Sequence, residues 1–457
     1  MKNWIILSLL LTTLGCSQTP KVKHFSAQTL TNKAPTTFMH DGGWCWYQDP
    51  RAIIHQDKLI IGGISGQSGD IRVSVFDLKN NKIIGETVLD AAFEVDDHNA
   101  PVFYMRPDNR LVATWATHGK EKVHYYRISA PNDFLAWQSI QIHQHPFDKP
   151  KSSYWGGVTY MNLYTIEKQQ RLYNFFRLGM DLNPYFSYSS NQGETWQGFT
   201  HFLQDDVAGK HRPYVKYSQI TPNTIGVNFT DAHPRDYGNS LYYASFNGAS
   251  FYRADGSKIK SLADGPLITK EAELIYQGSS LRKKPTGYGS MPNSAWTIDM
   301  ETDQNKRPYL GYSVYLKDND IRYRLAQWTG EKWLDREIAH AGSYLYKKES
   351  SYSGLLALDP TNPANIAIST DVNPTTGEHL KGQHEIYLAT VAEFDDKNSI
   401  KWQPLTKNSR YRNIRPIIVA GHGYKVLMWM KGPFNHFQDY KTNIVGYVIG
   451  QPKKRQQ

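Results

Sequence analysis

Histidine, tyrosine and arginine recur at similar places in several strand-like segments between residues 96 and 235. Histidine takes up a proton near neutral pH, and arginine binds a carboxylate through two parallel hydrogen bonds. A tyrosine beside such cations is expected to have a lowered pKa and to give or accept a proton. No pair of carboxylates for ordinary glycoside hydrolysis is evident. The set suits β-elimination at a uronic acid, in which a base removes the C5 proton, a cation holds the carboxylate and an acid protonates the leaving oxygen.

Hairpin geometry predicts that these residues meet at one level, since residues equidistant from a turn lie opposite each other. His98 and His118 are each ten residues from Asp108, which lies in an expected turn. By the same count, Tyr160 is expected opposite Arg177, Tyr214 opposite Thr230, Arg212 opposite Ala232, and His211 opposite His233. We therefore expect one depression surrounded by His98, His118, Tyr160, Arg177, Arg212, Tyr214 and His233, with Asn99 beside it. Tyr164 is an alternative to Tyr160, and Tyr217 an alternative to Tyr214.

The elements that must position these residues are short, aromatic strands. The chain has 457 residues, with 30 Tyr, 12 Trp, 34 Gly and 23 Pro, a composition that favours strands and turns. Seven pairs of strands recur: 51–55 with 58–63, 100–105 with 111–117, 157–164 with 172–177, 213–220 with 225–230, 295–300 with 309–315, 354–358 with 365–370, and 416–419 with 425–430. Their spacing predicts an all-β, seven-bladed β-propeller with four antiparallel strands per blade. A β-sandwich is the competing fold, and the seven similar units favour the propeller. Residues 189–196 resemble an Asp-box, a turn between outer blade strands.

The net charge of +10 favours an acidic partner. The basic residues are scattered rather than gathered in an arm, which argues against nucleic acid. An acidic polysaccharide, bound by a monomer, is the partner we expect.

The amino terminus reads as an export signal. A basic start and an apolar run lead to Gly15-Cys16, which is similar to a bacterial lipobox. We expect residues 1–16 to be a signal peptide, 17–40 a tether and 41–450 a single catalytic propeller. Cys16 would then carry a lipid anchor at the outer membrane or cell surface, with simple secretion as the alternative. The anchor would be the sole contact with a membrane.

Metal and cofactor motifs are weak. His143 and His145 could supply two metal ligands, but no Cys or carboxylate partner is evident nearby. Asp299, Asp303 and Asn305 lack the glycine and terminal glutamate of a calcium hand. No phosphate loop or dinucleotide fingerprint occurs. We therefore expect no cofactor and assign no metal ligands.

Four motifs together carry a family resemblance. They are Asp96-Asp97-His98-Asn99-Ala100-Pro101; Trp115-Ala116-Thr117-His118-Gly119; Thr159-Tyr160 with Phe175-Phe176-Arg177; and Arg212-Pro213-Tyr214 with Asp231-Ala232-His233. The chain resembles the seven-bladed ulvan lyases of marine bacteria over nearly its whole mature length.

The resemblance implies eliminative cleavage of ulvan, a sulfated polymer of rhamnose and glucuronic or iduronic acid. It implies catalytic roles for His98, His118, Tyr160 and Arg177, and a site role for Tyr214. We expect Tyr160 to serve as acid, and His98 rather than His118 to be the base for iduronate. Arg212, His233 and Asn99 are further expected substrate contacts. A sialidase-like hydrolase and a non-catalytic glycan-binding propeller are the alternatives.

Overall fold

The computed structural model describes residues 22–24, 33–148, 156–205, 212–282, 289–381, 383–393, 395 and 397–452. Regular structure in these residues is nearly all β-strand, which confirms the predicted class. The helical segments described are four 3-10 turns: η1 (Asp97–Asn99), η2 (Glu167–Gln169), η3 (Leu262–Asp264) and η4 (Thr269–Glu271). Within the described residues, no helix has the length and hydropathy needed to cross a bilayer. The expected signal peptide with Cys16 lies outside the described residues, as does His211.

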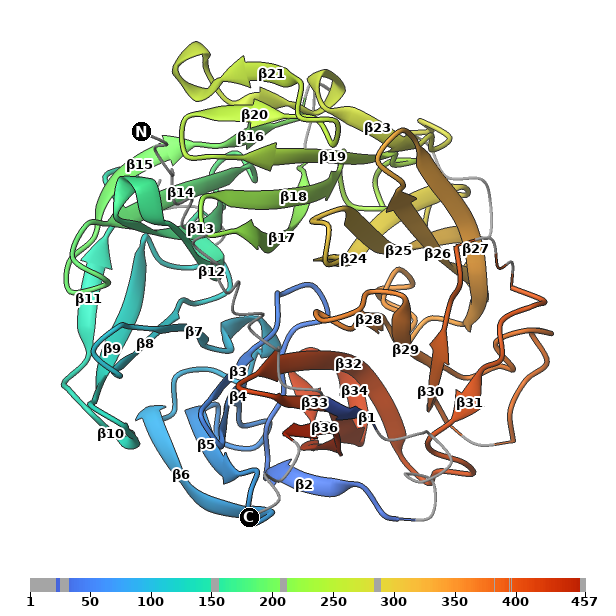
Figure 1. Ribbon diagram of the computed structural model, residues 1–457, viewed down its shortest axis with the longest axis horizontal. Coiled ribbons are helices and arrows are strands. Elements are labelled where there is room, and N and C mark those ends of the chain that lie inside the picture. Colours follow the sequence, from blue (N-terminus) through green and yellow to red (C-terminus); the bar gives the residue numbers. More distant parts are fainter. Residues whose placement is uncertain are drawn as a thin grey trace, which may run out of the picture.

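Seven antiparallel sheets surround a common axis, so the predicted seven-bladed propeller is confirmed (Figure 1). Blade 1 contains β3 (Ala52–His55), β4 (Lys58–Ile64), β5 (Ile71–Asp77) and β6 (Lys82–Asp90); blade 2 contains β7 (Val102–Met105), β8 (Leu111–Trp115), β9 (Val123–Ala130), β10 (Asp133–Trp137) and β11 (Gln141–Gln144). Blade 3 contains β12 (Val158–Ile166), β13 (Arg171–Leu178), β14 (Pro184–Ser189) and β15 (Gln197–His201). Blade 4 contains β17 (Tyr214–Thr221), β18 (Thr224–Thr230), β19 (Leu241–Phe246), β20 (Ser250–Tyr252), β21 (Lys258–Ser261) and β23 (Glu273–Tyr276).

The other three blades follow the same plan. Blade 5 contains β24 (Ser294–Thr302), β25 (Pro308–Lys317), β26 (Asp320–Trp328) and β27 (Trp333–Gly342); blade 6 contains β28 (Leu356–Leu358), β29 (Asn365–Thr370), β30 (Glu385–Thr390) and β31 (Gln403–Pro404). Blade 7 contains β32 (Arg412–Gly421), β33 (Tyr424–Gly432), β36 (Asn443–Pro452), β2 (Thr36–Met39) and β1 (Val22–His24). Two small sheets lie apart from the blades: β16 (Leu203–Gln204) with β22 (Leu267–Ile268), and β34 (Phe434–His436) with β35 (Asp439–Tyr440).

The ring is closed by pairing the two ends of the chain. Strand β2 pairs antiparallel with β36, so the edge of the last blade is covered by a strand from the amino-terminal side. This pairing removes an exposed strand edge, which would otherwise invite association with another chain. The propeller therefore begins before residue 41, and β2 lies inside the segment expected to be a tether. Four residues are too few to show a clear strand pattern in the sequence.

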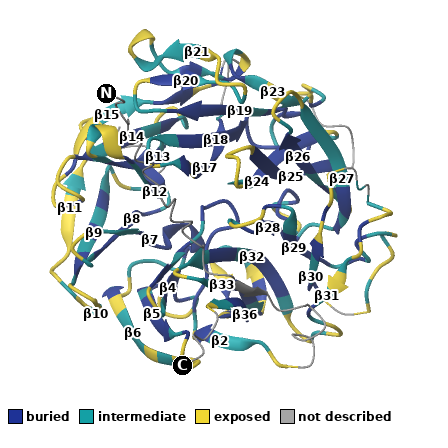
Figure 2. Ribbon diagram, in the orientation of Figure 1, coloured by how far each residue is buried: buried dark blue, intermediate teal, exposed yellow. Residues whose placement is uncertain are grey.

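The core lies between the faces of adjacent blades. Figure 2 shows the inner strands largely buried and several outer segments, such as β11, exposed. Trp115 on β8, Trp296 on β24 and Trp429 on β33 are fully buried, which accounts for the aromatic content of the sequence. The predicted Asp-box turn lies between β14 and β15 as expected, where Ser189 Oγ accepts a hydrogen bond from Gly193 N at 2.8 Å.

A central segment, residues 44–51, crosses the middle of the ring between β2 and β3 (Figure 1). Its side chains Trp44 to Tyr47 are buried. The ring of Trp46 lies 3.7 Å from that of Trp296 in blade 5, and Tyr47 donates a 2.7 Å hydrogen bond to Val215 O in blade 4. The segment therefore links blades across the axis and forms the floor beneath the inner strand ends.

Candidate active site

The predicted histidine pair is assembled at the inner end of blade 2. His98 lies in η1 just before β7, and His118 follows β8. Their rings stack with centroids 3.7 Å apart and planes 10° apart, so the two residues do lie level as the hairpin count predicted. The ring of Phe437, from the turn between β34 and β35, packs edge-on against both.

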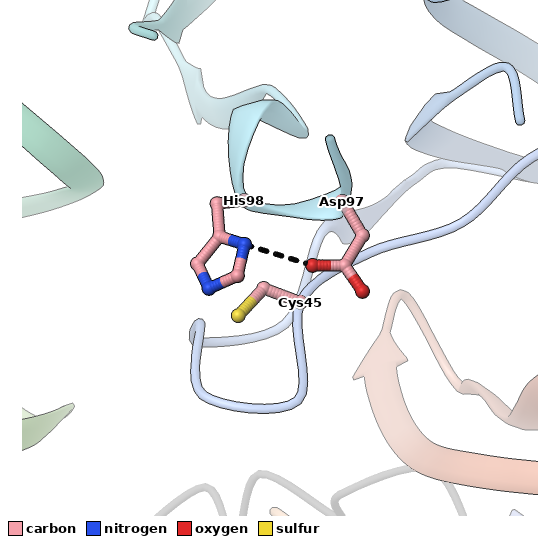
Figure 3. A group of neighbouring side chains, drawn as sticks. All are labelled: Cys45, Asp97 and His98. Carbon is pink, nitrogen blue, oxygen red and sulfur yellow. Dashed lines mark ion pairs between the residues drawn. The ribbon is translucent and has the colours of Figure 1, made fainter. Parts of the chain in front are cut away.

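One carboxylate orients both imidazoles. Asp96 lies 2.7 Å from His98 Nδ1 through Oδ1 and 3.1 Å from His118 Nδ1 through Oδ2. A second carboxylate, Asp97, lies 3.0 Å from His98 Nδ1, as Figure 3 shows beside the buried thiol of Cys45. Asp97 is itself paired with the buried Arg415 at 2.5 Å.

These partners give the two histidines opposite charge states. Burial disfavours the imidazolium of His98, but the surrounding groups, including Asp96 hydrogen-bonded to its Nδ1, outweigh burial and raise the pKa of His98 well above 6.5. Burial and the neighbouring His98 lower the pKa of His118 to about 4. At neutral pH, His98 is therefore an imidazolium and His118 a neutral imidazole that can accept a proton.

Tyr160 reaches the histidines through a β-bulge in blade 3. The register between β12 and β13 shifts between Thr159 and Asn162, so Thr159 rather than Tyr160 lies opposite Arg177. This corrects the predicted pairing by one residue. Tyr160 has φ of +62°, a left-handed conformation that is strained for a bulky residue and is found preferentially at functional sites.

The bulge turns the Tyr160 ring into the space between the neighbouring blades. The ring lies 5.5 Å from that of His98 and 6.4 Å from that of Tyr214, and the Arg177 guanidinium stacks over it at 4.6 Å. Burial raises the pKa of Tyr160, although His98 and Arg177 oppose that effect. The expected lowering of its pKa is therefore wrong, because desolvation outweighs the nearby cations.

Two guanidinium groups converge on Tyr214. Its hydroxyl accepts hydrogen bonds from Arg177 Nη1, Arg212 Nε and Arg212 Nη2, each at 3.2 Å. Burial opposes ionisation of this phenol, but Arg212 and Arg177 together lower its pKa below 10. No carboxylate of the described residues forms an ion pair with either arginine, and Arg177 Nε has no hydrogen-bond partner among them. The pair of cations is thus suited to receive an anion.

The remaining predicted residues are placed as follows. His233 lies with its ring 5.5 Å from that of Tyr214 and faces Glu349, 3.6 Å from its Nε2. Asn99 is buried and its Nδ2 donates to Glu94 at 3.4 Å, whereas its Oδ1 has no hydrogen-bond partner among the described residues. Tyr214 lies opposite Thr230 as predicted.

The two alternative tyrosines, Tyr164 and Tyr217, form hydrogen bonds and ring contacts with other residues. Tyr164 pairs with Tyr173, and its hydroxyl donates to Asp49 at 2.9 Å. Tyr217 stacks on Phe175 within the core, with ring centroids 4.6 Å apart. Tyr160 and Tyr214 are therefore the tyrosines that contact Arg177. A small pocket of about 20 Å³ is lined by Tyr160, Arg177 and Tyr217 among others.

Sequence reasoning missed three contributors. Asp96 stands two residues before His98 and belongs to the first motif of the family resemblance, but the sequence analysis gave it no role. The ring of Tyr47, in the central segment, lies 4.8 Å from the Tyr160 ring and 4.6 Å from the Tyr214 ring, and Phe437 comes from the turn between β34 and β35, which follow β33 of blade 7 in the chain. Neither aromatic residue lies near the hairpins of blades 2 to 4 in the sequence, so the tertiary fold brings them to the site.

Two groups at this site have the ligand types of a metal centre: Cys45 with Asp97 and His98, and Asp96 with His98 and His118. Both share His98, whose Nδ1 already faces two carboxylates. Asp97 is also occupied by Arg415, so a cation there would have to displace a buried guanidinium. The contacts present favour an imidazolium held by carboxylates over a metal.

The model of the BNR repeat-containing family matches residues 46–341, more than half of the chain.

The chain belongs to the BNR repeat-containing family.

Solved structures give the same fold for this family member. It is similar to an ulvan lyase from a new family of polysaccharide lyases, with a TM-score of 0.64, 13% identity, and 92% of this chain and 98% of that chain covered. The same values hold for a structure of that enzyme bound to glucuronic acid linked to sulfated rhamnose. The polysaccharide lyase Uly1 matches with a TM-score of 0.56 and 11% identity, over 94% of this chain and 97% of that chain. No curated protein matches the sequence.

The shared carboxylate can be tested by replacing Asp96 with Asn. The amide is neutral, so it no longer stabilises the imidazolium, and we expect the pKa of His98 to fall toward or below its ordinary value. Histidine side-chain NMR titration measures this change. Asp133→Asn, on the exposed start of β10, is the matched control and should leave the pKa unchanged. An unchanged His98 pKa in Asp96→Asn would contradict the assigned electrostatics.

Proposed function

We propose that this protein is a polysaccharide lyase that cleaves ulvan by β-elimination at glucuronic or iduronic acid. The observation that carries the proposal is the convergence of Arg177 and Arg212 on Tyr214, beside Tyr160 and the histidine pair, with no carboxylate of the described residues paired to either arginine. Such a site binds the carboxylate of a uronic acid and holds proton-transfer groups next to it. The shared fold of the two lyases over more than 90% of this chain supports the same reaction class.

In this reaction the C5–H bond breaks and its electrons form the C4–C5 double bond while the C4–O4 bond breaks. Proton loss places a second negative charge on the substrate carboxylate, so binding by a guanidinium is stronger in the transition state than in the ground state. Arg177 has an Nε without a partner among the described residues and a guanidinium plane already fixed by stacking on Tyr160. We assign the carboxylate to Arg177, with Arg212 contributing from the other side of Tyr214.

The charge states of the histidines revise their expected roles. A base must be neutral before reaction, and His118, with its pKa lowered to about 4, meets that requirement. His98, expected from the sequence to be the base, is held as an imidazolium by two carboxylates. We therefore assign proton abstraction from iduronate to His118 and a positioning role to His98.

Tyr160 is suited to be the acid. Its raised pKa keeps the phenol protonated at neutral pH, so a proton is available for the departing O4. In glucuronate the C5 proton and O4 lie on the same side of the ring, so tyrosine groups on that side serve both steps. Tyr214, with its lowered pKa, is the phenol there that most readily accepts a proton.

For location, we propose export to the cell envelope through lipidation of Cys16. The support is the Gly15-Cys16 pair after the apolar run. Two or more acyl chains are needed for stable anchoring. Mass spectrometry of the native amino terminus should find a modified Cys16, and a free terminus downstream of it would indicate simple secretion.

Replacing Arg177 tests the assigned function most simply. Arg177→Ala should slow the appearance of the unsaturated product, followed at 235 nm on ulvan, by about 10²–10³-fold, because one preorganised donor to the developing charge is lost. Arg177→Lys should recover part of the rate, since it restores the charge without the planar fork. The control is Arg171→Ala at the other end of β13, where the side chain stacks on Tyr188. Turnover near that of the wild type in Arg177→Ala would place the site elsewhere.

Because His118 is assigned as the base for iduronate and Tyr160 as the acid for both uronates, the loss of activity in each variant should depend on the uronate that is cleaved. His118→Gln should lower cleavage of iduronate-rich ulvan by about 10²–10⁴-fold, the usual contribution of a general base, with much less effect on glucuronate-rich fractions. Tyr160→Phe should abolish cleavage of both. Initial rates on the iduronate-rich and glucuronate-rich fractions measure the difference between the two losses, and thermal melts check that each variant is folded. Equal losses on both fractions in His118→Gln would rule out the separate base.

A further inference from the structure

The chain enters the propeller from the face opposite the candidate active site. Strand β32 begins at the active-site face, where Arg415 binds Asp97 of the site. Strands β33 and β36 alternate in direction next to it, so β36 starts at the active-site face with Asn443 and ends at the opposite face with Pro452. Strand β2 runs antiparallel to β36, so the chain before Thr36 comes from the side of Pro452.

Strand β1 extends this edge of blade 7 to the opposite face. Val22 at its start pairs with Pro452, so β1 runs from that face toward the site, as β2 does. A fully extended chain spans at most about 3.3–3.6 Å per residue, so covalent geometry limits the distance from Cys16 to Val22 to about 20 Å. An acyl anchor on Cys16 would therefore hold the start of β1, and with it the face opposite the site, close to a membrane.

The sequence around the paired ends of β1 and β36 is basic. The cations that we call the basic edge are Lys21, Lys23, Lys453, Lys454 and Arg455. The first two flank Val22 in the sequence, and the other three follow Pro452 directly. Residues 1–40 and 440–457 contain no Asp or Glu, so neither segment supplies a carboxylate that neutralises these charges. Charges of one sign gathered in this way attract a surface of the opposite sign.

The turn between β5 and β6 of blade 1 adds exposed cations on the same face. Blades 1 and 7 meet there, since the rings of His55, at the end of β3, and His422, between β32 and β33, are 5.4 Å apart. Lys79 and Lys82 are exposed in the β5–β6 turn. Asp77 of this turn accepts hydrogen bonds from two backbone N–H groups at 2.9 and 2.8 Å, so its carboxylate is engaged within the turn.

We propose that the basic edge lies against an anionic phospholipid surface, so that the active-site depression opens away from the membrane. The proposal rests on the proposed lipidation of Cys16, which supplies the other attachment. Stable membrane attachment takes two signals, and an acyl anchor with a polybasic segment is one such pair. The sequence alone predicts the anchor as the sole contact with a membrane, whereas the strand order brings a surface of the protein close to it.

This orientation suits an acidic polymer as substrate. Lipid phosphates and uronates carry charge of the same sign, so a site turned toward the membrane would repel the polymer that it has to bind. The 10 residues of β36, at about 3.4 Å each, separate the two faces by about 30 Å. That separation exceeds the Debye length of about 8–10 Å, so the lipid charge is screened before it reaches Arg177 and Arg212.

Probes on the two faces test the orientation. The native lipidated protein is reconstituted into vesicles of phosphatidylethanolamine and phosphatidylglycerol that carry spin labels on their headgroups. Asn80→Cys places a fluorophore on the exposed β5–β6 turn, and Lys348→Cys places it on the exposed loop between β27 and β28 at the active-site face. Cys45 is buried, so the introduced thiol is the one that reacts. We expect the Asn80 probe to be quenched. Quenching at Lys348 that equals or exceeds it would overturn the proposal.

Neutralising the basic edge tests the lipid contact itself. The mature Cys16→Ser chain carries no acyl group, so its binding to vesicles reports on the protein surface alone. The triple variant Lys453→Gln/Lys454→Gln/Arg455→Gln should lower its partition onto vesicles containing phosphatidylglycerol about 10²-fold, because each cation near an anionic surface contributes about a factor of five. Sedimentation with the vesicles at low salt measures the partition.

A matched control separates this inference from the proposed lipidation. Lys347→Gln/Lys348→Gln/Arg410→Gln removes the same charge from exposed positions of the active-site face and should partition like the parent chain. Equal partition of the two triple variants would overturn the lipid contact. If mass spectrometry finds Cys16 unmodified, the anchor is refuted, and the partition of the Cys16→Ser chain still decides whether the basic edge binds lipid. If Cys16 is modified but the Asn80 probe is not quenched, the anchor stands and the orientation is refuted.

Discussion

Two buried guanidinium groups hold the centre of this propeller together. Arg51 donates to Asn162 Oδ1 and Met161 O at 3.1 and 2.8 Å, and Asn162 in turn donates to Tyr160 O at 3.1 Å. Arg415 binds Asp97 and Trp44 O, each at 2.5 Å. Each guanidinium makes two of these contacts, while Arg51 Nε and Arg415 Nε and Nη2 have no hydrogen-bond partner among the described residues. Because breaking a contact would leave a buried charge uncompensated, these contacts fix the geometry of the groups around them. The first arginine supports the bulge that presents Tyr160, and the second anchors the carboxylate beside His98.

The two histidines and the two tyrosines that these contacts position differ in their pKa values. Asp96 bridges the Nδ1 atoms of the two stacked imidazoles, and Asp97 lies beside His98 as well, which favours the charged form of that ring. Burial and the neighbouring His98 favour the neutral form of His118. The two phenols likewise differ in pKa. Burial raises the pKa of Tyr160, and the two guanidinium groups lower the pKa of Tyr214. Environments that push like groups to opposite protonation states provide an acid and a base from the same residue types.

The sequence predicted most of the architecture because the seven inner hairpins are local, and local pairing follows from turns and strand periodicity. Counting residues from each turn correctly predicted that His98 lies level with His118 and that Tyr214 lies opposite Thr230. It missed the one-residue shift at Tyr160, since a bulge depends on Arg51, more than a hundred residues away. The ring closure by β2 and the approach of Phe437 depend equally on long-range pairing, and the desolvation of Tyr160 depends on packing that no local pattern records.

The central claim is that the site breaks the glycosidic bond by elimination. Ulvan digested in water enriched in ¹⁸O, with product masses read by mass spectrometry, tests it directly. Elimination adds no water, so the new ends should be unsaturated uronates without ¹⁸O, each lighter by one water than a hydrolysis product. Saturated products that carry one ¹⁸O per cleavage would show hydrolysis instead and would contradict the account.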